Sequence, residues 1–175
     1  MHLGQNLHWH ENHKRLCKRI YQFSHSTAFQ KLEKHERMDS LLLTHLLAHL
    51  STLEAPYSSE QSKQQALFQS LLSGPLDISL PPYCPIKPPP PSDDFVANLF
   101  FRFGNNNFTI HSHLNSIAHG IFPLASRLFN HSCVANAACK YVLTSGSTVA
   151  MEVVALKAVP AGAEVRRTLQ VSDCG

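Results

Sequence analysis

The residues best suited to chemistry lie in one short stretch, 130–136, with the sequence NHSCVAN. Asn130 and Asn136 each offer hydrogen-bond donors and an acceptor, and a neutral His131 offers one of each. Buried groups of this kind need partners, either in the protein or in a ligand. The residues alone leave open a structural turn and a ligand-binding loop. A cysteine nucleophile at Cys133 is disfavoured, because neighbours in sequence rarely have the geometry that a nucleophile and its base need.

Two further spacings could bind a metal ion. His13 and Cys17 are four residues apart, so a helix would place an imidazole and a thiolate on one face. A structural zinc site needs four ligands, and no other cysteine lies nearby in the sequence. His45 and His49 share this spacing, but their ligand set would also be incomplete. They more often form the edge of a packed helix.

The composition indicates a globular chain of one domain, or of one small domain and a fragment. At 175 residues, with 43% hydrophobic residues, the chain can bury a core. A charged content of only 15% argues against a disordered, solvated chain. The net charge of +3 and the pI of about 8.6 are mildly basic and do not indicate a nucleic-acid-binding protein.

The cysteines and the hydropathy predict an intracellular, soluble protein of the nucleus, the cytoplasm or both. Five cysteines at irregular spacing do not resemble a secreted disulfide framework. The N-terminal residues include no apolar signal segment. No apolar run approaches the ~20 residues that span a bilayer.

The hydrophobic periodicity predicts an α+β chain, helical before Pro81 and rich in strands after Asn105. Expected helices are 11–23, 34–54, 59–73 with Leu67, Leu71 and Leu72 on its apolar face, and 93–103 with acidic residues at its start. Expected strands are 108–110 and a hairpin of 137–143 with 148–155, and turns are expected at 119–120 and 159–162. Seven prolines within 81–91 predict a stiff spacer outside the core, or less often an SH3 or WW ligand.

Three phrases, NNFTI at 106–110, GIFP at 120–123 and NHSC at 130–133, resemble in this order the SET-domain protein lysine methyltransferases. The closest likeness is to the SET-and-MYND branch of that family. The resemblance implies that Asn130 and His131 bind S-adenosylmethionine and that Asn106 contacts the methionine end of this cofactor. It also implies a segment threaded as a pseudoknot.

The N-terminal residues resemble the end of a MYND zinc finger, with the pattern Q-x-x-H-W…H-K-x-x-C at 5–17. This resemblance implies that His13 and Cys17 are zinc ligands. Gly4 stands where the finger has a cysteine, so the zinc site would be incomplete and weak.

Departures at the C-terminal end predict a truncated, incomplete or inactive member of the family. Leu169 stands where the family has the tyrosine that closes the lysine channel, and the post-SET cysteine cluster is missing, so no catalytic residue is assigned. The expected division is a MYND remnant at 1–25, a helical segment at 26–80, a proline-rich linker at 81–92 and a partial SET domain at 93–170.

The resemblance implies a monomeric enzyme that methylates a lysine of a histone or another protein, without binding membranes or, directly, nucleic acid. The alternative is a non-catalytic protein-interaction module on a SET/MYND scaffold. A zinc-dependent DNA-binding finger is a weaker alternative, because four ligands are lacking.

Overall fold

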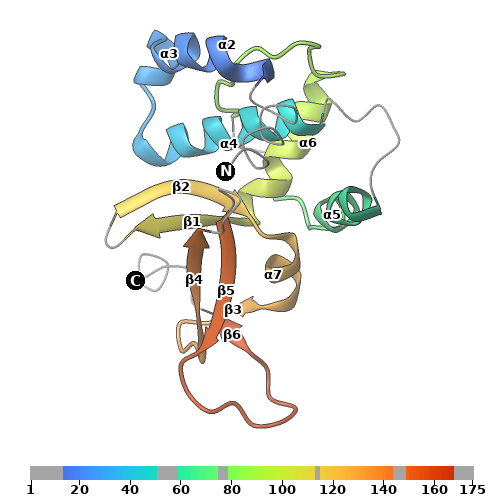
Figure 1. Cartoon of the computed structure of the whole chain (residues 1–175), viewed down its shortest axis with the longest axis vertical. Coiled ribbons are helices and arrows are strands. Elements are labelled where there is room, and N and C mark those ends of the chain that lie inside the picture. The colour runs from blue at the N-terminus through green and yellow to red at the C-terminus, as the bar shows by residue number, and fades with distance from the viewer. Residues whose placement is uncertain (1–13, 51–58, 75–78, 113–114, 144–148, 168–175) are drawn as a thin grey trace.

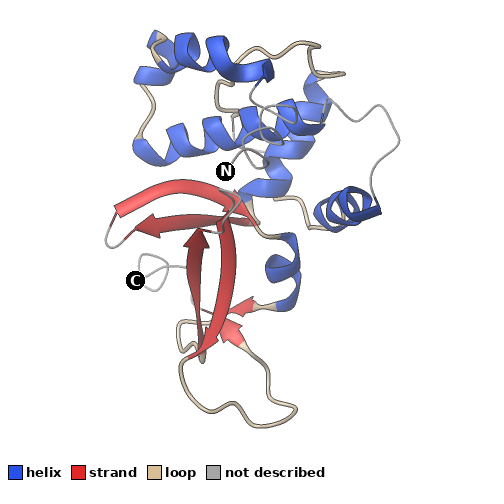
Figure 2. Ribbon diagram, in the orientation of Figure 1, coloured by secondary structure: helices blue, strands red, loops and turns tan. Residues whose placement is uncertain are grey.

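The computed structural model describes residues 14–50, 59–74, 79–112, 115–143 and 149–167. Helices gather at one end of the molecule and strands at the other, as Figures 1 and 2 show. This arrangement confirms the predicted α+β class, with helices in the first half of the chain. No helix among the described residues has both the length and the apolarity that crossing a membrane requires.

Five helices precede the strands in the described chain. They are α2 (Lys14–Ser24), α3 (Thr27–Gln30), α4 (Lys34–Leu50), α5 (Ser59–Gln69) and α6 (Asp93–Gly104). The start of α6 follows the expected pattern, because the hydroxyl of Ser92 accepts a hydrogen bond from the backbone N–H of Phe95 and two aspartates occupy the first turn.

The main core lies between α4 and α6, with residues of α2 and α5 packed against them. Leu43 and Leu47 of α4 and Phe103 of α6 are fully buried, as the spacing of apolar residues predicts. The expectation for the face of α5 is wrong at one position. Leu71 is buried but Leu72 is 82% exposed, because α5 ends at Gln69 and its helical periodicity stops there.

The proline-rich segment packs against α4. The hydroxyl of Ser40 donates to the carbonyl of Pro82 at 2.6 Å, and the hydroxyl of Thr44 accepts from the backbone N–H of Cys84 at 3.0 Å. Cys84 and Ile86 are buried in the hydrophobic core. The prediction that this segment stays outside the core is therefore wrong, because two buried hydroxyls of α4 bind its backbone.

The strands form two sheets. One is the antiparallel hairpin of β1 (Asn107–Ser112) and β2 (Asn115–Ile121), and the other contains β3 (Asn130–His131), β4 (Ala137–Leu143), β5 (Val149–Ala155) and β6 (Arg166–Arg167). The helix α7 (Pro123–Leu128) connects the sheets. The hairpin of β4 and β5 confirms the sequence prediction. The turn expected at 119–120 is wrong, because Thr109 pairs with His119 inside β2.

Aromatic contacts join the two sheets. Phe108 of β1 meets Phe122 edge to face at 5.6 Å between ring centroids, and Phe122 lies 5.9 Å from Tyr141 of β4. Such pairs favour a defined relative placement of the elements that carry them. The hairpin is therefore held against the larger sheet near the start of β1.

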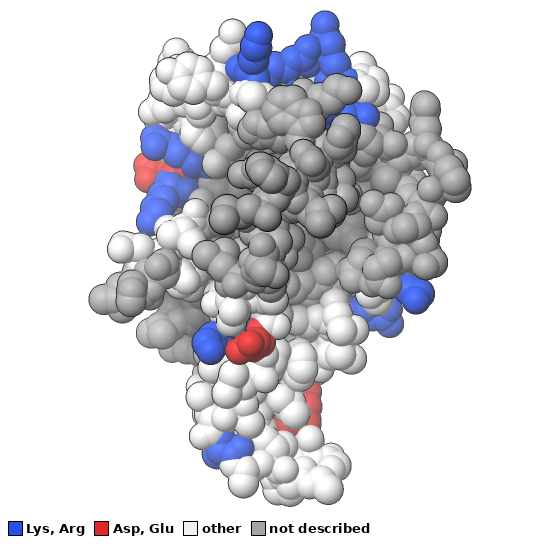
Figure 3. Space-filling view, viewed as in Figure 1, with Lys and Arg blue, Asp and Glu red and all other residues white. Residues whose placement is uncertain are grey.

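Basic side chains concentrate on α2, whose sequence KRLCKRIYQFS contains four lysines and arginines. Figure 3 shows Lys and Arg atoms grouped at the end of the molecule where α2 lies in Figure 1. The strands β3 and β6 lie near the opposite end. The basic helix is thus not placed to contact the 130–136 stretch.

Candidate functional site

The NHSCVAN stretch encloses a segment that comes thirty residues later in the chain. In the larger sheet the strand order is β3-β6-β4-β5, so β6 lies between two strands that only the loop 132–136 connects. Ser132 N–H donates to the carbonyl of Arg167 at 2.8 Å, and Asn136 N–H donates to that of Arg166 at 3.0 Å. Strands that follow each other in the chain usually lie side by side, so the insertion of β6 between β3 and β4 is the less common order.

The side chain of Asn136 binds the loop to the segment that contains β6. Its Nδ2 donates to the carbonyl of Glu164 at 2.9 Å, and its Oδ1 accepts from the backbone N–H of Arg166 at 2.8 Å. An amide side chain can satisfy a backbone donor and a backbone acceptor at once, as a strand would. Asn136 therefore has a structural role, which corresponds to one of the two interpretations left open by the sequence.

Asn130 binds the same segment from the other side of the loop. Its Nδ2 donates to Oε1 of Glu164 at 2.7 Å, and both residues are exposed. The second carboxylate oxygen of Glu164 lies 3.9 Å from Nε of Arg166. An exposed amide next to an exposed carboxylate leaves both groups accessible to a ligand.

His131 is half-buried beside Asn130, and its Nε2 lies 3.5 Å from the sulfur of Cys133. The Cys133 sulfur is engaged in a disulfide. A disulfide sulfur has no thiolate to attack a substrate, so this geometry does not support a cysteine nucleophile. The structure thus brings Asn130 together with Glu164, a residue that sequence reasoning did not select, while His131 follows Asn130 in the short strand β3.

Asn106 is bound at the end of α6. Its Nδ2 donates to the carbonyls of Arg102 at 2.6 Å and Leu72 at 2.8 Å, which ties the end of α6 to the segment after α5. Its carbonyl oxygen accepts from the hydroxyl of Ser126 in α7 at 3.2 Å. No hydrogen bond among the described residues joins Asn106 to Asn130, and the amide hydrogens of Asn106 already have acceptors. Contact with a cofactor stays a prediction for this residue.

Arg167 of β6 is buried directly beneath the loop. It is 7% exposed, its guanidinium carbon lies 4.3 Å from the ring centroid of Phe108, and its Nε has no hydrogen-bond partner among the described residues. Burial lowers the pKa of Arg167, although the nearby Cys139 and Tyr141 act in the opposite direction. A cationic side chain thus occupies a position where a strand would normally bury an apolar one. The sequence pattern signalled this only as an interruption of the apolar alternation.

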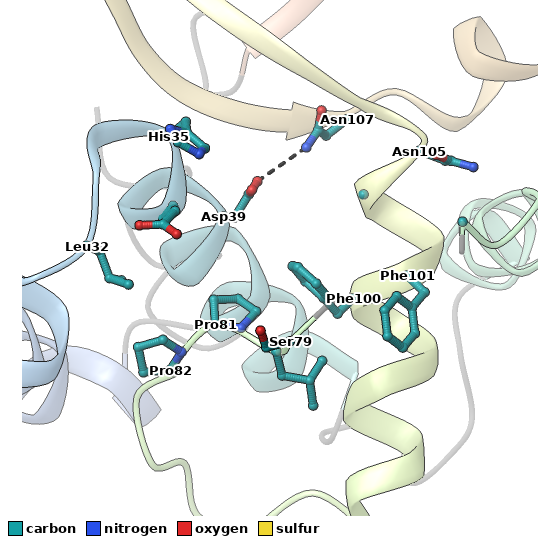
Figure 4. A pocket seen from close by; sticks show the side chains of 14 residues that line it. Leu32, His35, Asp39, Ser79, Pro81, Pro82, Phe100, Phe101, Asn105 and Asn107 are labelled. Carbon is teal, nitrogen blue, oxygen red and sulfur yellow. Dashed lines mark hydrogen bonds between the residues drawn. The ribbon is translucent and has the colours of Figure 1, made fainter. Parts of the chain in front are cut away.

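A second polar group links α4 to the hairpin. Nδ1 of His119 in β2 lies 2.6 Å from Oδ1 of Asp39, which also accepts from Nδ2 of Asn107 at 3.3 Å. Asp39 and Asn107 line a cavity of about 510 Å³ between α4 and α6, which Figure 4 shows with their hydrogen bond dashed. Sequence reasoning missed this pair, because Asp39 and His119 are 80 residues apart.

The zinc prediction finds no support in the described part of the chain. Cys17 is an exposed, free cysteine of α2, and His13 lies outside the described residues. Within the ranges that the structure describes, no three His, Cys, Asp or Glu side chains group so that they could hold a metal ion.

Comparison with known proteins agrees with the resemblance seen in the sequence. The model of the SET domain family matches residues 9–166, so the match includes the helices as well as the strands. No curated protein matches the chain. Since the matched residues form most of its length, the chain belongs to the SET-domain family.

Proposed function

We propose that this SET-domain protein is a protein-lysine N-methyltransferase of the SET-and-MYND branch, in an incomplete or weakly active form, that uses S-adenosylmethionine. The phrases at 106–110, 120–123 and 130–133 support the branch. The family match supports methyl transfer to a protein as the general activity. Monomeric action on a histone or another protein, in the nucleus or cytoplasm, belongs to the same proposal.

The observation that carries the proposal is the fastening of the 130–136 loop around β6. The hydrogen bonds that hold the two segments together include two from the loop backbone, two through the Asn136 side chain and one from Asn130 to Glu164. This fixed backbone presents the Asn130 amide and the His131 ring from one short strand. Rigid presentation of binding groups lowers the entropy cost of holding a ligand.

The cofactor fits the chemistry of these donors. S-adenosylmethionine carries hydroxyl, ammonium and adenine groups, which an amide, an imidazole and a carboxylate can bind. Asn130 and Glu164 are exposed and 2.7 Å apart, and His131 is the next residue of the same short strand. Asn130 and His131 would hold the cofactor, and Glu164 would orient the Asn130 amide. When bound, the cofactor supplies an electrophilic methyl group.

The lysine to be methylated must be uncharged, since only the free amine has a lone pair. A free lysine has a pKa of ~10.4, so an apolar channel must disfavour its ammonium form. The family tyrosine that orients the amine corresponds to Leu169, which lies outside the described residues. The absence of that hydroxyl from the sequence is why the proposal expects weak turnover.

Cofactor binding is tested by isothermal titration of the full chain with S-adenosylmethionine. We expect binding that falls at least about tenfold in Asn130→Ala, since a hydrogen bond to a charged group contributes ~1.5–3 kcal/mol. Asn98→Ala is the matched control, because it removes an exposed amide of α6 that donates to the backbone carbonyl of Asp94 in its own helix. Absence of binding by a folded protein, shown by circular dichroism, would refute the proposal.

The alternative is a non-catalytic interaction module on a SET/MYND scaffold, favoured by the buried Arg167 and by Leu169. Transfer of a labelled methyl group to histones and to mixed proteins separates the two. Incorporation above a heat-denatured control supports the enzyme. Cofactor binding without any incorporation supports the alternative.

A further inference from the structure

The cavity between α4 and α6 combines acidic and apolar walls. It has a volume of about 510 Å³ and is lined by the carboxyl-bearing residues Glu36 and Asp39 of α4. Phe100 and Phe101 of α6 form another part of the wall, and Pro81 and Pro82 close a further side (Figure 4). Leu80 also lines the cavity. No lysine or arginine is among the described residues that line it.

Asp39 is held in place with one oxygen in use. Its side-chain hydrogen bonds to His119 and Asn107 both go to Oδ1, and its side chain is 22% exposed. In the part of the chain that the structure describes, no donor is bonded to its Oδ2. A positioned carboxylate with an unused oxygen at a cavity wall is suited to an N–H donor, and a charged donor forms the stronger bond.

The remaining residues that line the cavity favour a partner with an apolar stem. Leu32, Leu80 and the phenylalanines provide apolar contacts over a length that a flexible hydrocarbon chain can cover. Aromatic rings also attract a cation placed over their faces. A group with an apolar stem and a cationic end therefore complements both walls, whereas an anion would meet two carboxylates.

We propose that this cavity binds the side chain of a lysine in an extended protein segment, with its ammonium group at Asp39 and Glu36. The inference rests on the proposed function in one respect. An enzyme that methylates a lysine meets protein segments that carry several lysines, so a second lysine is available to this cavity. The cavity is lined by Asn105 and Asn107 and not by Asn130 or His131, so it would hold a lysine other than the one that reacts.

The test is an NMR titration of the full chain, without cofactor, using the peptide acetyl-Gly-Gly-Lys-Gly-Gly-amide. A peptide with norleucine in place of lysine keeps the stem and removes the ammonium group. We expect weak binding, roughly millimolar as befits one side chain, and shifts at the backbone amides of Gly104 and Asn107. The norleucine peptide should bind at least about fivefold more weakly.

Variants of this chain test whether the Glu36 carboxylate binds the ammonium group. Glu36→Gln should weaken the lysine peptide about threefold to fivefold, the upper range for one accessible ion pair. Glu33→Gln makes the same charge change on an exposed residue outside the lining and should leave binding unchanged. His35→Asn, inside the lining, should not weaken binding, because an imidazole does not attract an ammonium group.

Equal binding of the two peptides, or no shift at Gly104 and Asn107, would overturn the inference. An equal loss in Glu33→Gln and Glu36→Gln would do the same, because it would indicate a general charge effect. The proposed function fails separately, in the titration with S-adenosylmethionine, which involves neither Glu36 nor the peptide.

Discussion

Asn130 donates its side-chain amide to the carboxylate of Glu164 at 2.7 Å, although 34 residues separate them in the chain. This bond crosses from the loop to the segment that the loop encloses. Both groups are exposed, so the bond contributes little to stability and instead places two polar groups side by side. Asn136 binds the same segment on the other flank, through backbone groups. The two asparagines of one motif thus have different roles.

Asn136→Ala should destabilise the protein by about 1–2 kcal/mol, because it removes two side-chain hydrogen bonds to the backbone of the segment that contains β6. Urea denaturation measures the loss. Asn136→Asp keeps an oxygen acceptor for Arg166 and should lose less. Asn130→Ala, on the exposed flank, should cost under about 1 kcal/mol, and a loss as large as that of Asn136→Ala would contradict this division of roles.

Arg167→Met should leave the protein as stable or raise its free energy of unfolding by about 1 kcal/mol. Replacing a buried, incompletely bonded charge with an apolar side chain is often neutral or stabilising, while the contact with the Phe108 ring offsets part of the gain. Arg166→Met changes an exposed neighbour in the same strand and should have almost no effect. A loss above about 1 kcal/mol in Arg167→Met would show that the guanidinium stabilises the fold.

Tyr141 should make stability fall at high pH. Burial, together with the nearby Cys139, raises the pKa of Tyr141 to about 12, with Arg167 acting in the opposite direction. The unfolded chain then loses this proton near pH ~10 while the folded chain keeps it, so unfolding becomes easier as the pH rises towards about 12. Below pH ~10 Tyr141 is protonated in both the folded and the unfolded chain, so its titration does not lower the free energy of unfolding there.

Spectrophotometric titration of tyrosinate should show one tyrosine that ionises later than the free side chain, and this late step should be missing in Tyr141→Phe. Urea denaturation above pH ~10 should show a smaller decline for Tyr141→Phe than for the natural protein. An unchanged titration curve in the variant would assign the late step to another tyrosine.

His119→Ala should lower the free energy of unfolding by about 1–3 kcal/mol, because it leaves the partly buried carboxylate of Asp39 without its closest partner. The hairpin would also lose a link to α4. His111→Ala in the same hairpin replaces an exposed imidazole and serves as the control. Guanidinium denaturation of both variants measures the difference, and similar losses would indicate that the Asp39 pair does not stabilise the hairpin.

Local patterns predicted the elements that depend on neighbouring residues. The helix α6 follows from Ser92, two aspartates and an apolar face, and the hairpin of β4 and β5 follows from two β-branched runs with a glycine between them. The turn expected at His119 and Gly120 was wrong, because glycine also fits where backbone and side chains approach closely. A Cβ at Gly120 would lie 2.9 Å from Cδ1 of Ile110 in the paired strand.

Long-range pairs could not be predicted in this way. Asp39 meets His119 across 80 residues and Ser40 meets Pro82 across 42, and each contact depends on how α4 packs against later elements. The sequence also offered no sign that the spacer-like prolines would flank a buried Cys84. The hydroxyl of Thr44 accepts a hydrogen bond from the backbone N–H of Cys84. In the sequence, nothing distinguishes Thr44 from the other positions of a leucine-rich helix.

The amino-acid sequence by itself determined the class of fold and the helices and hairpin that follow from local periodicity. It also contains the NHSC motif, with Asn130 and His131, that indicates the SET-domain family. Only the tertiary structure decided which groups surround them. The insertion of β6 beneath the loop brings Glu164 to Asn130 and buries Arg167 against Phe108. The physical reason is that hydrogen bonds and burial depend on distance in space, which periodicity along the chain does not encode.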